Sequence, residues 1–378
     1  MLTPVALSEH PGDAIEHAAA HAPYLAKLMQ TVPGYEDPDA LLRAAHAVCQ
    51  QAGLNGADPA AALRLAKKQA HLAIAAGDLC GQYALSTTTR HITEFADAAL
   101  QAALRLALQE RGLTGHGLFA VALGKMGAFE LNYSSDIDIA VFFDAEKFDG
   151  GDRDPDDAAM RCVRRAINLL DDRTSDGYVF RTDLRLRPDP SSTPVAVSTR
   201  RAELYYESVG QNWERMVWIK GRCAAGDDEA GAAFIQALEP FVWRRHLDYW
   251  AIADVHAIKN MINAKVGAQS LHDTAPDVKL GPGGIREIEF FVQTQQIILG
   301  GRNPSLRVRG TLEGLQRLVE LGVVEPESAT ELSQAYDALR MVEHYFGPTP
   351  AEWQQRFYSK FAPNVFTPAQ VEQCCAEY

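Results

Sequence analysis

Residues 117–144, GLFAVALGKMGAFELNYSSDIDIAVFFD, decide the fold. The two ends of this stretch are apolar runs of strand length, FAVAL at 119–123 and IDIAVFF at 137–143, rich in Val, Ile and Phe. Between them the chain turns through Gly124 and Gly127. The pattern predicts two strands joined by a glycine turn.

The second of these strands opens with two acids, Asp136 and Asp138. Side chains two apart on a strand share a face, so both carboxylates project together, with Cα atoms roughly 6.6 Å apart. Such a pair repels itself unless a cation lies between, and Mg²⁺ prefers carboxylate oxygens together with substrate phosphates. Gly124 lets the backbone approach a phosphate, and Ser134 and Ser135 can donate hydrogen bonds to it. We expect a metal and phosphate site, the alternative being an Asp-x-Asp that merely begins a strand.

Two better-known phosphate motifs are excluded. A P-loop requires a glycine five residues before its Gly-Lys and a Ser or Thr after the lysine, where this chain has Phe119 and Met126. A dinucleotide fingerprint requires G-x-G-x-x-G, and GKMG supplies only one of its spacings. The chain is therefore predicted to be neither a kinase-type ATPase nor a dehydrogenase.

A second charged strand is predicted at 178–188, YVFRTDLRLRP, after a helix over about 157–172. Its period of two places Arg181, Asp183, Arg185 and Arg187 on one face. A β-α-β path would return this strand to the sheet that holds Asp136. Arg185 and Arg187 are candidate phosphate ligands, because guanidinium groups match phosphate oxygens. The alternative is a solvated face.

Two further segments carry candidate nucleotide or phosphate contacts. WERMVWIKGR at 213–222 contributes Arg215 and Lys220, for which a purely structural role is equally open. In KLGPGGIREIEFFVQ at 279–293, a glycine loop flanked by Lys279 leads into a helix whose N-terminus favours anions. Arg286 and Glu289 share one face of that helix, where the alternative is a surface ion pair.

The remainder of the sequence indicates an α+β protein with helices on both sides of this core. We expect a helical N-terminal region at 1–115, the core at 116–226 and a helical C-terminal region at 227–378. Two helical apolar stripes support the first of these. One contains Ile92, Phe95, Ala96, Ala99, Ala103 and Leu106, and the other contains Leu65, Leu72 and Leu79 on a helix that Pro59 would begin.

Composition bounds the class of protein. The 378 residues are 47% hydrophobic and 22% charged, as in ordinary globular proteins, and the formal net charge of −13 argues against nucleic acid as a partner. The six cysteines show no CxxC pair and no zinc spacing. No stretch reads as a signal peptide or approaches 18 apolar residues. A cytoplasmic protein with reduced thiols and no membrane span is expected.

The motifs resemble those of a known family. A glycine turn, a spacer of about ten residues and Asp-x-Asp on the next strand are typical of the nucleotidyltransferase superfamily. The string GKMGAFELNYSSDIDIAVFF is similar to the glutamine synthetase adenylyltransferase family, bifunctional enzymes that transfer and remove adenylyl groups. The segments at 180–198, 213–222 and 279–293 agree, so the resemblance covers roughly 59–344. ELNYSSDID and IREIEF resemble the N-terminal, adenylyl-removing half, and no second Asp-x-Asp constellation follows.

The resemblance implies a nucleotidyltransferase fold and a deadenylylase. Such an enzyme would remove AMP from a tyrosine of adenylylated glutamine synthetase, with phosphate as the attacking group and ADP as product. The superfamily uses a third carboxylate on a neighbouring strand, which implies that Asp183 joins Asp136 and Asp138 in holding Mg²⁺ or Mn²⁺. Gly124, Lys125, Ser134 and Ser135 would bind the phosphate side, and the 279–293 segment would be a lid or wall at the nucleotide.

Two other functions stay open at this point. The same fold could run in the forward direction and transfer AMP from ATP to a tyrosine. Alternatively, the chain could be a non-catalytic module that docks on glutamine synthetase or on the PII signalling protein. The clustered carboxylates argue against pure docking, because a scaffold has no use for them. After about residue 344 the sequence departs from the family pattern.

Overall fold

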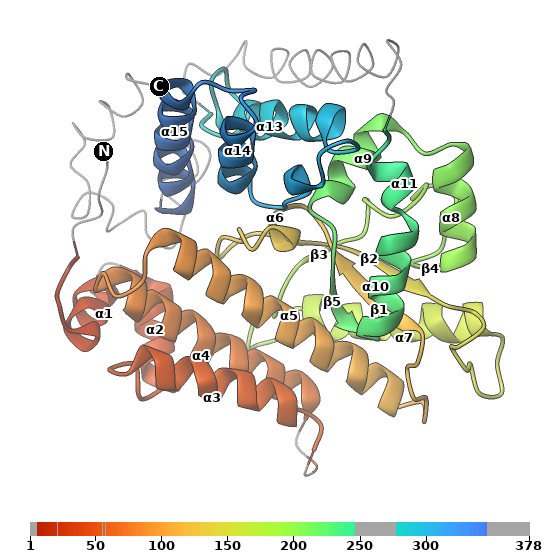
Figure 1. The fold of residues 1–378 in the computed structure, drawn as a ribbon. Helices are drawn as coiled ribbons and strands as arrows, with labels where there is room; N and C mark the ends of the chain where they lie inside the picture. The colour runs from red at the N-terminus through yellow and green to blue at the C-terminus, as the bar shows by residue number, and fades with distance from the viewer. Residues whose placement is uncertain (1–5, 21, 55, 57, 246–276, 346–378) are drawn as a thin grey trace, which may run out of the picture. The chain divides into compact units, whose positions relative to one another are not determined.

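The computed structural model describes residues 6–20, 22–54, 56, 58–245 and 277–345. The chain divides into two compact units (Figure 1). The first unit consists of residues 37–74 and 86–242, and the second consists of residues 1–36, 75–85 and 243–378. Helices and a mixed five-stranded sheet together make this an α+β protein, as predicted.

The sheet of the first unit is built around the strand that carries Asp138. The strands are β1 (Leu118–Ala122), β2 (Ile137–Phe143), β3 (Thr182–Asp183), β4 (Ala196–Ser198) and β5 (Arg222–Gly226). β1 pairs antiparallel with β2 and β5, whereas β3 and β4 both pair parallel with β2. The two predicted strands at 119–123 and 137–143 are thus confirmed to within one residue.

β1 and β2 are buried on both faces, which explains why their sequences are continuous apolar runs rather than alternating ones. Asp138 is the one residue of β2 that is half-buried instead of buried. Helix α10 (Asp228–Ala237) lies across β1 and β5 (Figure 1), where the Phe234 ring packs against Phe142 with centroids 4.6 Å apart. Helix α7 (Pro155–Asp171) contacts β3 and β4 and forms the predicted crossover.

Long helices complete the first unit. The predicted stripe on α5 (Leu85–Gln109) is confirmed, because all six of its residues are buried. On α4 (Pro59–Leu79), which begins at the predicted proline, Leu72 is buried but Leu65 is 41% exposed. The prediction for Leu65 was wrong because α4 is covered on one side only at that turn, where Leu63 and Ala66 are buried, whereas residues 70–74 are all buried. The other helices of this unit are α3 (Pro38–Gln51), α6 (Gly124–Gly127), α8 (Thr199–Ser208), α9 (Asn212–Ile219) and α11 (Glu239–Val242).

The predicted strand at 178–188 forms only two residues of β3. Beyond Asp183 the chain turns, because the Asp183 carboxylate accepts a hydrogen bond from the Arg185 N–H at 2.8 Å. The Arg187 guanidinium then holds the loop by its main-chain carbonyls, with donor–acceptor distances of 2.8–3.1 Å. These acceptors belong to Leu184, Pro190, Thr193 and Pro194. Local side-chain hydrogen bonds therefore override the alternating pattern.

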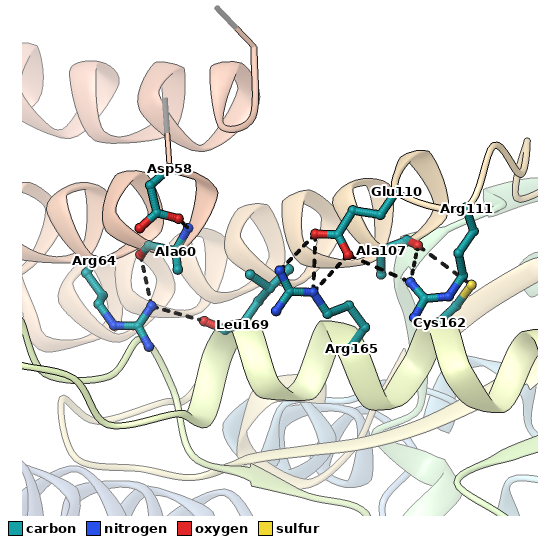
Figure 2. Close-up of polar contacts among 9 residues, drawn as sticks. All are labelled: Asp58, Ala60, Arg64, Ala107, Glu110, Arg111, Cys162, Arg165 and Leu169. Atoms are coloured by element: carbon teal, nitrogen blue, oxygen red, sulfur yellow. Dashed lines mark hydrogen bonds and ion pairs between the residues drawn. The ribbon is translucent and has the colours of Figure 1, made fainter. Parts of the chain in front are cut away.

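Contacts from α4 and from the end of α5 hold the middle and the C-terminal part of the crossover helix α7 (Figure 2). The Arg165 guanidinium of α7 donates two short hydrogen bonds, 2.8 and 2.9 Å, to the Glu110 carboxylate after α5. Arg64 of α4 donates to the carbonyls of Ala60 at 2.9 Å and of Leu169 in α7 at 3.5 Å. The exposed Arg165–Glu110 pair is worth at most about 1 kcal/mol, so burial supplies most of this packing.

The second unit is helical in its described residues. Its elements are α1 (Pro11–Ala19), α2 (Pro23–Thr31), α13 (Ile285–Leu299), a 3₁₀ turn (Pro304–Leu306), α14 (Thr311–Glu320) and α15 (Pro326–Tyr345). Val292, Leu306, Leu315 and Leu318 form its buried centre, and Ile285 and Ile288 of α13 are also buried. Cys374 and Cys375, and the divergent segment after residue 345, lie outside the described residues. Among the helices that are described, none is long and apolar enough to cross a membrane.

One lysine of α4 is buried in the first unit. Lys67 is 9% exposed, donates to the Tyr178 carbonyl at 3.1 Å and lies 4.2 Å from the centroid of the Tyr178 ring. Burial, and then repulsion by Arg181 and Arg64, lower the pKa of this ammonium to about 7. None of the ion pairs seen among the described residues involves Lys67, so the folded state holds a poorly compensated cation.

We expect Lys67→Met to stabilise the protein near pH 6.5. Because the Lys67 pKa is about 7 when folded and about 10.5 when unfolded, the unfolded chain binds more protons between these pH values. Below pH 7 the buried charge therefore lowers the free energy of unfolding by its full amount, which is at most about 5 kcal/mol. This destabilisation disappears as the pH rises towards 10.5. Thermal melts at pH 6.5 and pH 10 should show a gain that shrinks with pH.

The neighbouring Lys68 provides the control for this prediction. Its ammonium pairs with Asp176 at the surface, and its side chain is 19% exposed. Lys68→Met should give no gain in melting temperature that depends on pH. An equal response of the two variants, or a lower melting temperature for Lys67→Met at pH 6.5, would show that Lys67 is not a destabilising cation.

Candidate active site at the start of β2

The glycine turn touches the acid of β2 directly. Gly124 has φ +53°, and a Cβ atom built there would lie 2.5 Å from Asp138 Oδ2. The Leu123 N–H donates to the Asp138 carbonyl at 2.9 Å. A side chain at position 124 would therefore displace the carboxylate, which gives this glycine a structural reason in addition to the phosphate approach expected from the sequence.

The other glycine of the turn permits a second close approach. A Cβ at Gly127 would lie 2.1 Å from the Lys220 carbonyl oxygen. Next to it, Arg222 of β5 donates to the Met126 carbonyl at 3.0 Å and pairs with Asp97 at 2.8 Å. Burial raises the pKa of Asp97 to about 6, partly offset by this arginine. Arg222 of β5 thus fixes the turn through the Met126 carbonyl.

Strand pairing brings the predicted third carboxylate beside the first two. β2 and β3 are parallel, and their register sets Asp138 opposite Asp183, as the β-α-β path predicts. Neighbouring strands lie about 4.8 Å apart, so these residues are adjacent. Asp136 directly precedes β2. Of the three carboxylates that were expected to hold a metal ion, two therefore lie at the start of β2, and the third lies opposite them on β3.

Two of these carboxylates form ion pairs with arginines. Arg185, whose side chain is 84% exposed, donates to both Asp183 oxygens at 2.5–3.0 Å and lowers the pKa of that carboxyl group. Arg181 pairs with Asp136 Oδ1 and also donates to the Ser134 carbonyl at 2.8 Å. No three His, Cys, Asp or Glu side chains within the described ranges converge as a ready metal centre. The oxygen donors nonetheless suit Mg²⁺ or Mn²⁺, and the arginines supply positive charge at the same positions.

The two serines have different environments. The Ser135 hydroxyl accepts a hydrogen bond from the Asn132 N–H at 3.0 Å, and the Ser135 N–H returns one to the Asn132 carbonyl. Ser135 thereby closes the turn before β2. Ser134 is exposed, and Lys125 is half-buried on α6. A phosphate role for these residues remains a prediction.

The structure gives three of the predicted cations structural roles. Arg215 is fully buried and donates to the carbonyls of Phe241 and Val242, which corrects its prediction as a phosphate contact. Arg187 uses its guanidinium on the loop after β3, as described above, and Lys220 pairs with Glu130 at 3.3 Å. A charge that is buried is usually paired or hydrogen-bonded in this way, and one sequence cannot distinguish such a residue from a ligand.

The remaining candidates belong to the second unit. Lys279 lies 4.0 Å from Glu343, and Glu289 accepts a hydrogen bond from the Tyr336 hydroxyl at 3.5 Å. Arg286 is exposed. At the start of α13 the Glu287 carboxylate accepts from the Gly283 N–H at 2.9 Å, so part of the predicted anion site is satisfied internally. A role for this segment at the nucleotide stays a prediction.

Three further cations, Arg64, Lys67 and Arg181, contact Asp136 or the chain that leads to β3, and none of them has a role predicted from the sequence. Arg181 was placed on the charged face of the strand but was given no role. The signal that could have revealed Arg64 and Lys67 is their spacing of three on a helix, next to apolar positions that are buried, such as Leu63 and Ala66. Cations on a buried helix face require acceptors from another element.

Comparison with known proteins identifies the family. The sequence model described as glutamate-ammonia ligase adenylyltransferase matches residues 12–237, and the model described as GlnD PII-uridylyltransferase matches residues 256–346. The bifunctional glutamine synthetase adenylyltransferase/adenylyl-removing enzyme of Caulobacter vibrioides is 50% identical over 334 residues, which cover 85% of this chain and 34% of the relative.

Two further relatives of the same name agree. The protein of Rhizobium meliloti is 48% identical over 307 residues, covering 78% of this chain and 31% of the relative. That of Agrobacterium fabrum is 49% identical over 298 residues, which cover 75% of this chain and 30% of the relative. The chain spans about a third of the length of these relatives. The resemblance found in the sequence is confirmed, and the chain belongs to the glutamate-ammonia ligase adenylyltransferase family.

Proposed function

We propose that this chain removes AMP from adenylylated glutamine synthetase by phosphorolysis, producing ADP and unmodified enzyme. The observation that carries the proposal is the placement of Asp136, Asp138 and Asp183 at paired strand ends against the Gly124 turn. The relatives are named for both adenylyl transfer and adenylyl removal. The choice of removal depends on the resemblance of ELNYSSDID and IREIEF to the adenylyl-removing half.

In this proposal a phosphate oxygen attacks the phosphorus of the tyrosine-bound AMP. The bond from phosphorus to the tyrosine oxygen breaks, the tyrosine oxygen takes a proton from water, and the new phosphorus–oxygen bond completes ADP. Asp136, Asp138 and Asp183 would hold Mg²⁺ or Mn²⁺, which neutralises phosphate charge and orients the attacking and leaving oxygens. Ser134 and the backbone at Gly124 and Lys125 would bind the phosphate side. The exposed Arg185 would release the Asp183 carboxylate and bind the incoming phosphate instead.

The forward reaction is the second candidate, because the relatives' names include adenylyltransferase. There a tyrosine oxygen would attack the α-phosphorus of ATP, with pyrophosphate leaving, at the same carboxylates. The match of residues 256–346 to a PII-uridylyltransferase model supports the PII protein as a further partner. Glutamine synthetase, phosphate and a nucleotide are the partners that the main proposal requires.

The reaction itself is the first test. The purified chain should form ADP from adenylylated glutamine synthetase only when phosphate and a divalent metal are both present. The reason is that phosphate supplies the second phosphoryl group of ADP and the metal offsets the charge of both reactants. Release of pyrophosphate from ATP and unmodified synthetase, without the phosphate-dependent reaction, would establish the opposite direction.

Metal binding can be tested without the protein substrate. Millimolar Mg²⁺ or Mn²⁺ should raise the melting temperature, since a ligand specific for the folded state stabilises it by about 2.7 kcal/mol at a hundredfold excess over Kd. Asp138→Asn should abolish this rise. Asp152→Asn, in the acidic loop after β2, should keep it. A folded Asp138→Asn protein with the full metal-induced shift would place the metal elsewhere.

Arg185 and Arg187 should respond differently to substitution. Arg185→Ala should raise the apparent KM for phosphate about tenfold or more with little change in melting temperature, because its side chain is 84% exposed. Arg187→Ala should instead lower the melting temperature, because several main-chain carbonyls lose their donor. If Arg185→Ala leaves the KM for phosphate unchanged, the Arg185–Asp183 pair is only a surface contact.

A further inference from the structure

The connection between α7 and β3, residues 172–181, ends at Arg181. This arginine contacts the site in three ways. Its carbonyl accepts from the Ile137 N–H at 2.9 Å, its Nη2 donates to the Ser134 carbonyl at 2.8 Å, and its Nε pairs with Asp136 Oδ1. Arg181 therefore fixes both the main chain before β2 and the side chain of its first acid.

The geometry of the Asp136 pair suits a metal ligand. Arg181 engages Oδ1, and no hydrogen bond from the described part of the chain engages Oδ2. A ligating carboxylate is commonly oriented in this way, with one oxygen held by a neighbouring donor and the other directed to the ion. Both side chains are more than 40% exposed, and such a pair adds little to stability. The main effect of the Arg181–Asp136 pair is therefore to orient the Asp136 carboxylate.

Two side chains of helix α4 bind main-chain carbonyls of the 172–181 connection. Arg64 donates to the carbonyls of Gly177 at 2.8 Å and of Asp172, and it reaches the Leu169 carbonyl at the end of α7 (Figure 2). Lys67 donates to the Tyr178 carbonyl at 3.1 Å. Residues 172–176 are exposed, whereas Val179 and Phe180 are buried and their N–H groups donate to the Leu170 carbonyl at 2.8 and 3.0 Å. Arg64 and Lys67 add side-chain donors to these main-chain contacts on the path that leads to Arg181.

Lys67 is an unfavourable choice for stability alone. Its ammonium is buried beside two arginines, and burial lowers its pKa to about 7. An apolar side chain of the same length would fill this position without a buried charge. Positions that contradict local stability in this way are commonly functional.

We infer that Arg181 is the positioning residue of Asp136, and that Arg64 and Lys67 of α4 position Arg181 by holding the 172–181 connection. This inference rests on the proposed metal site. It assigns the helical segment before the core a part in metal binding, although none of its residues touches the ion.

The test uses Arg181→Gln and Lys67→Met, with Lys68→Met as the matched control. Lys68 lies on the same helix and also contacts the connection, but through the Asp176 side chain at 2.6 Å instead of a carbonyl. The Mn²⁺ dissociation constant is measured by titration calorimetry. The apparent KM for Mn²⁺ and the kcat are measured in phosphate-dependent ADP formation.

Arg181→Gln should weaken Mn²⁺ binding by about 10- to 100-fold, the usual effect of removing a partner of a metal ligand. Lys67→Met should weaken it several-fold, and Lys68→Met should not change it. At saturating Mn²⁺ the kcat of each variant should stay within about threefold of wild type, because excess metal compensates for a poorly oriented ligand. A purely structural role would lower kcat and leave the KM for Mn²⁺ unchanged.

Wild-type Mn²⁺ affinity in both folded variants would overturn the inference, as would loss of kcat alone. Should Arg181→Gln fail to fold, Arg181→Lys retains the charge without the fork that spans Asp136 and Ser134, and an intermediate loss of affinity is expected. A wild-type protein that binds Mn²⁺ but forms no ADP would contradict the proposed reaction only, since the titrations still decide this inference. A wild-type protein that binds no Mn²⁺ would contradict both.

Discussion

The parallel register of β2 and β3 is the constraint on which the site depends. It sets Asp138 opposite Asp183, so two acids distant in sequence become neighbours. Uncompensated carboxylates at that spacing repel each other, and nearby arginines offset this repulsion. Arg185 pairs with Asp183, and Arg181 pairs with Asp136. A charge pattern that alternates in the sequence thus becomes a set of ion pairs in space.

The strands and their order could be predicted because they depend on local patterns. Apolar runs of five and seven residues that are rich in Val, Ile and Phe and bounded by turn residues favour buried strands, and the helix between Asp154 and Asp172 makes the crossover parallel. Fold class and family were accessible from one stretch for this reason. The contact between Gly124 and Asp138 was not predicted, because the glycine was expected only to let the backbone approach a phosphate.

The roles of individual cations could not be predicted, because they depend on acceptors far away in the sequence. Arg215 meets the carbonyls at 241 and 242, and Arg64 meets those at 172 and 177. A guanidinium that recognises a carbonyl and one that recognises a phosphate look alike in sequence. A different limit applies to β3, where local hydrogen bonds of Asp183 and Arg187 stabilise a turn in place of the expected strand.

The distribution of these cations indicates how the site is divided. Three of the buried cations, Arg64, Lys67 and Arg215, bind main-chain carbonyls and therefore fix the shape of the backbone. The buried Lys220 and Arg222 instead pair with the carboxylates of Glu130 and Asp97. Those that are exposed, Arg181 and Arg185, bind carboxylates and can exchange them for another partner at small cost. Reactive groups that must release one ion to bind another require such exposed pairs. Their positions must still be accurate, and only a buried scaffold can provide that accuracy. In the inference drawn above, the buried Lys67 belongs to this scaffold, because its ammonium reaches the Tyr178 carbonyl of the connection.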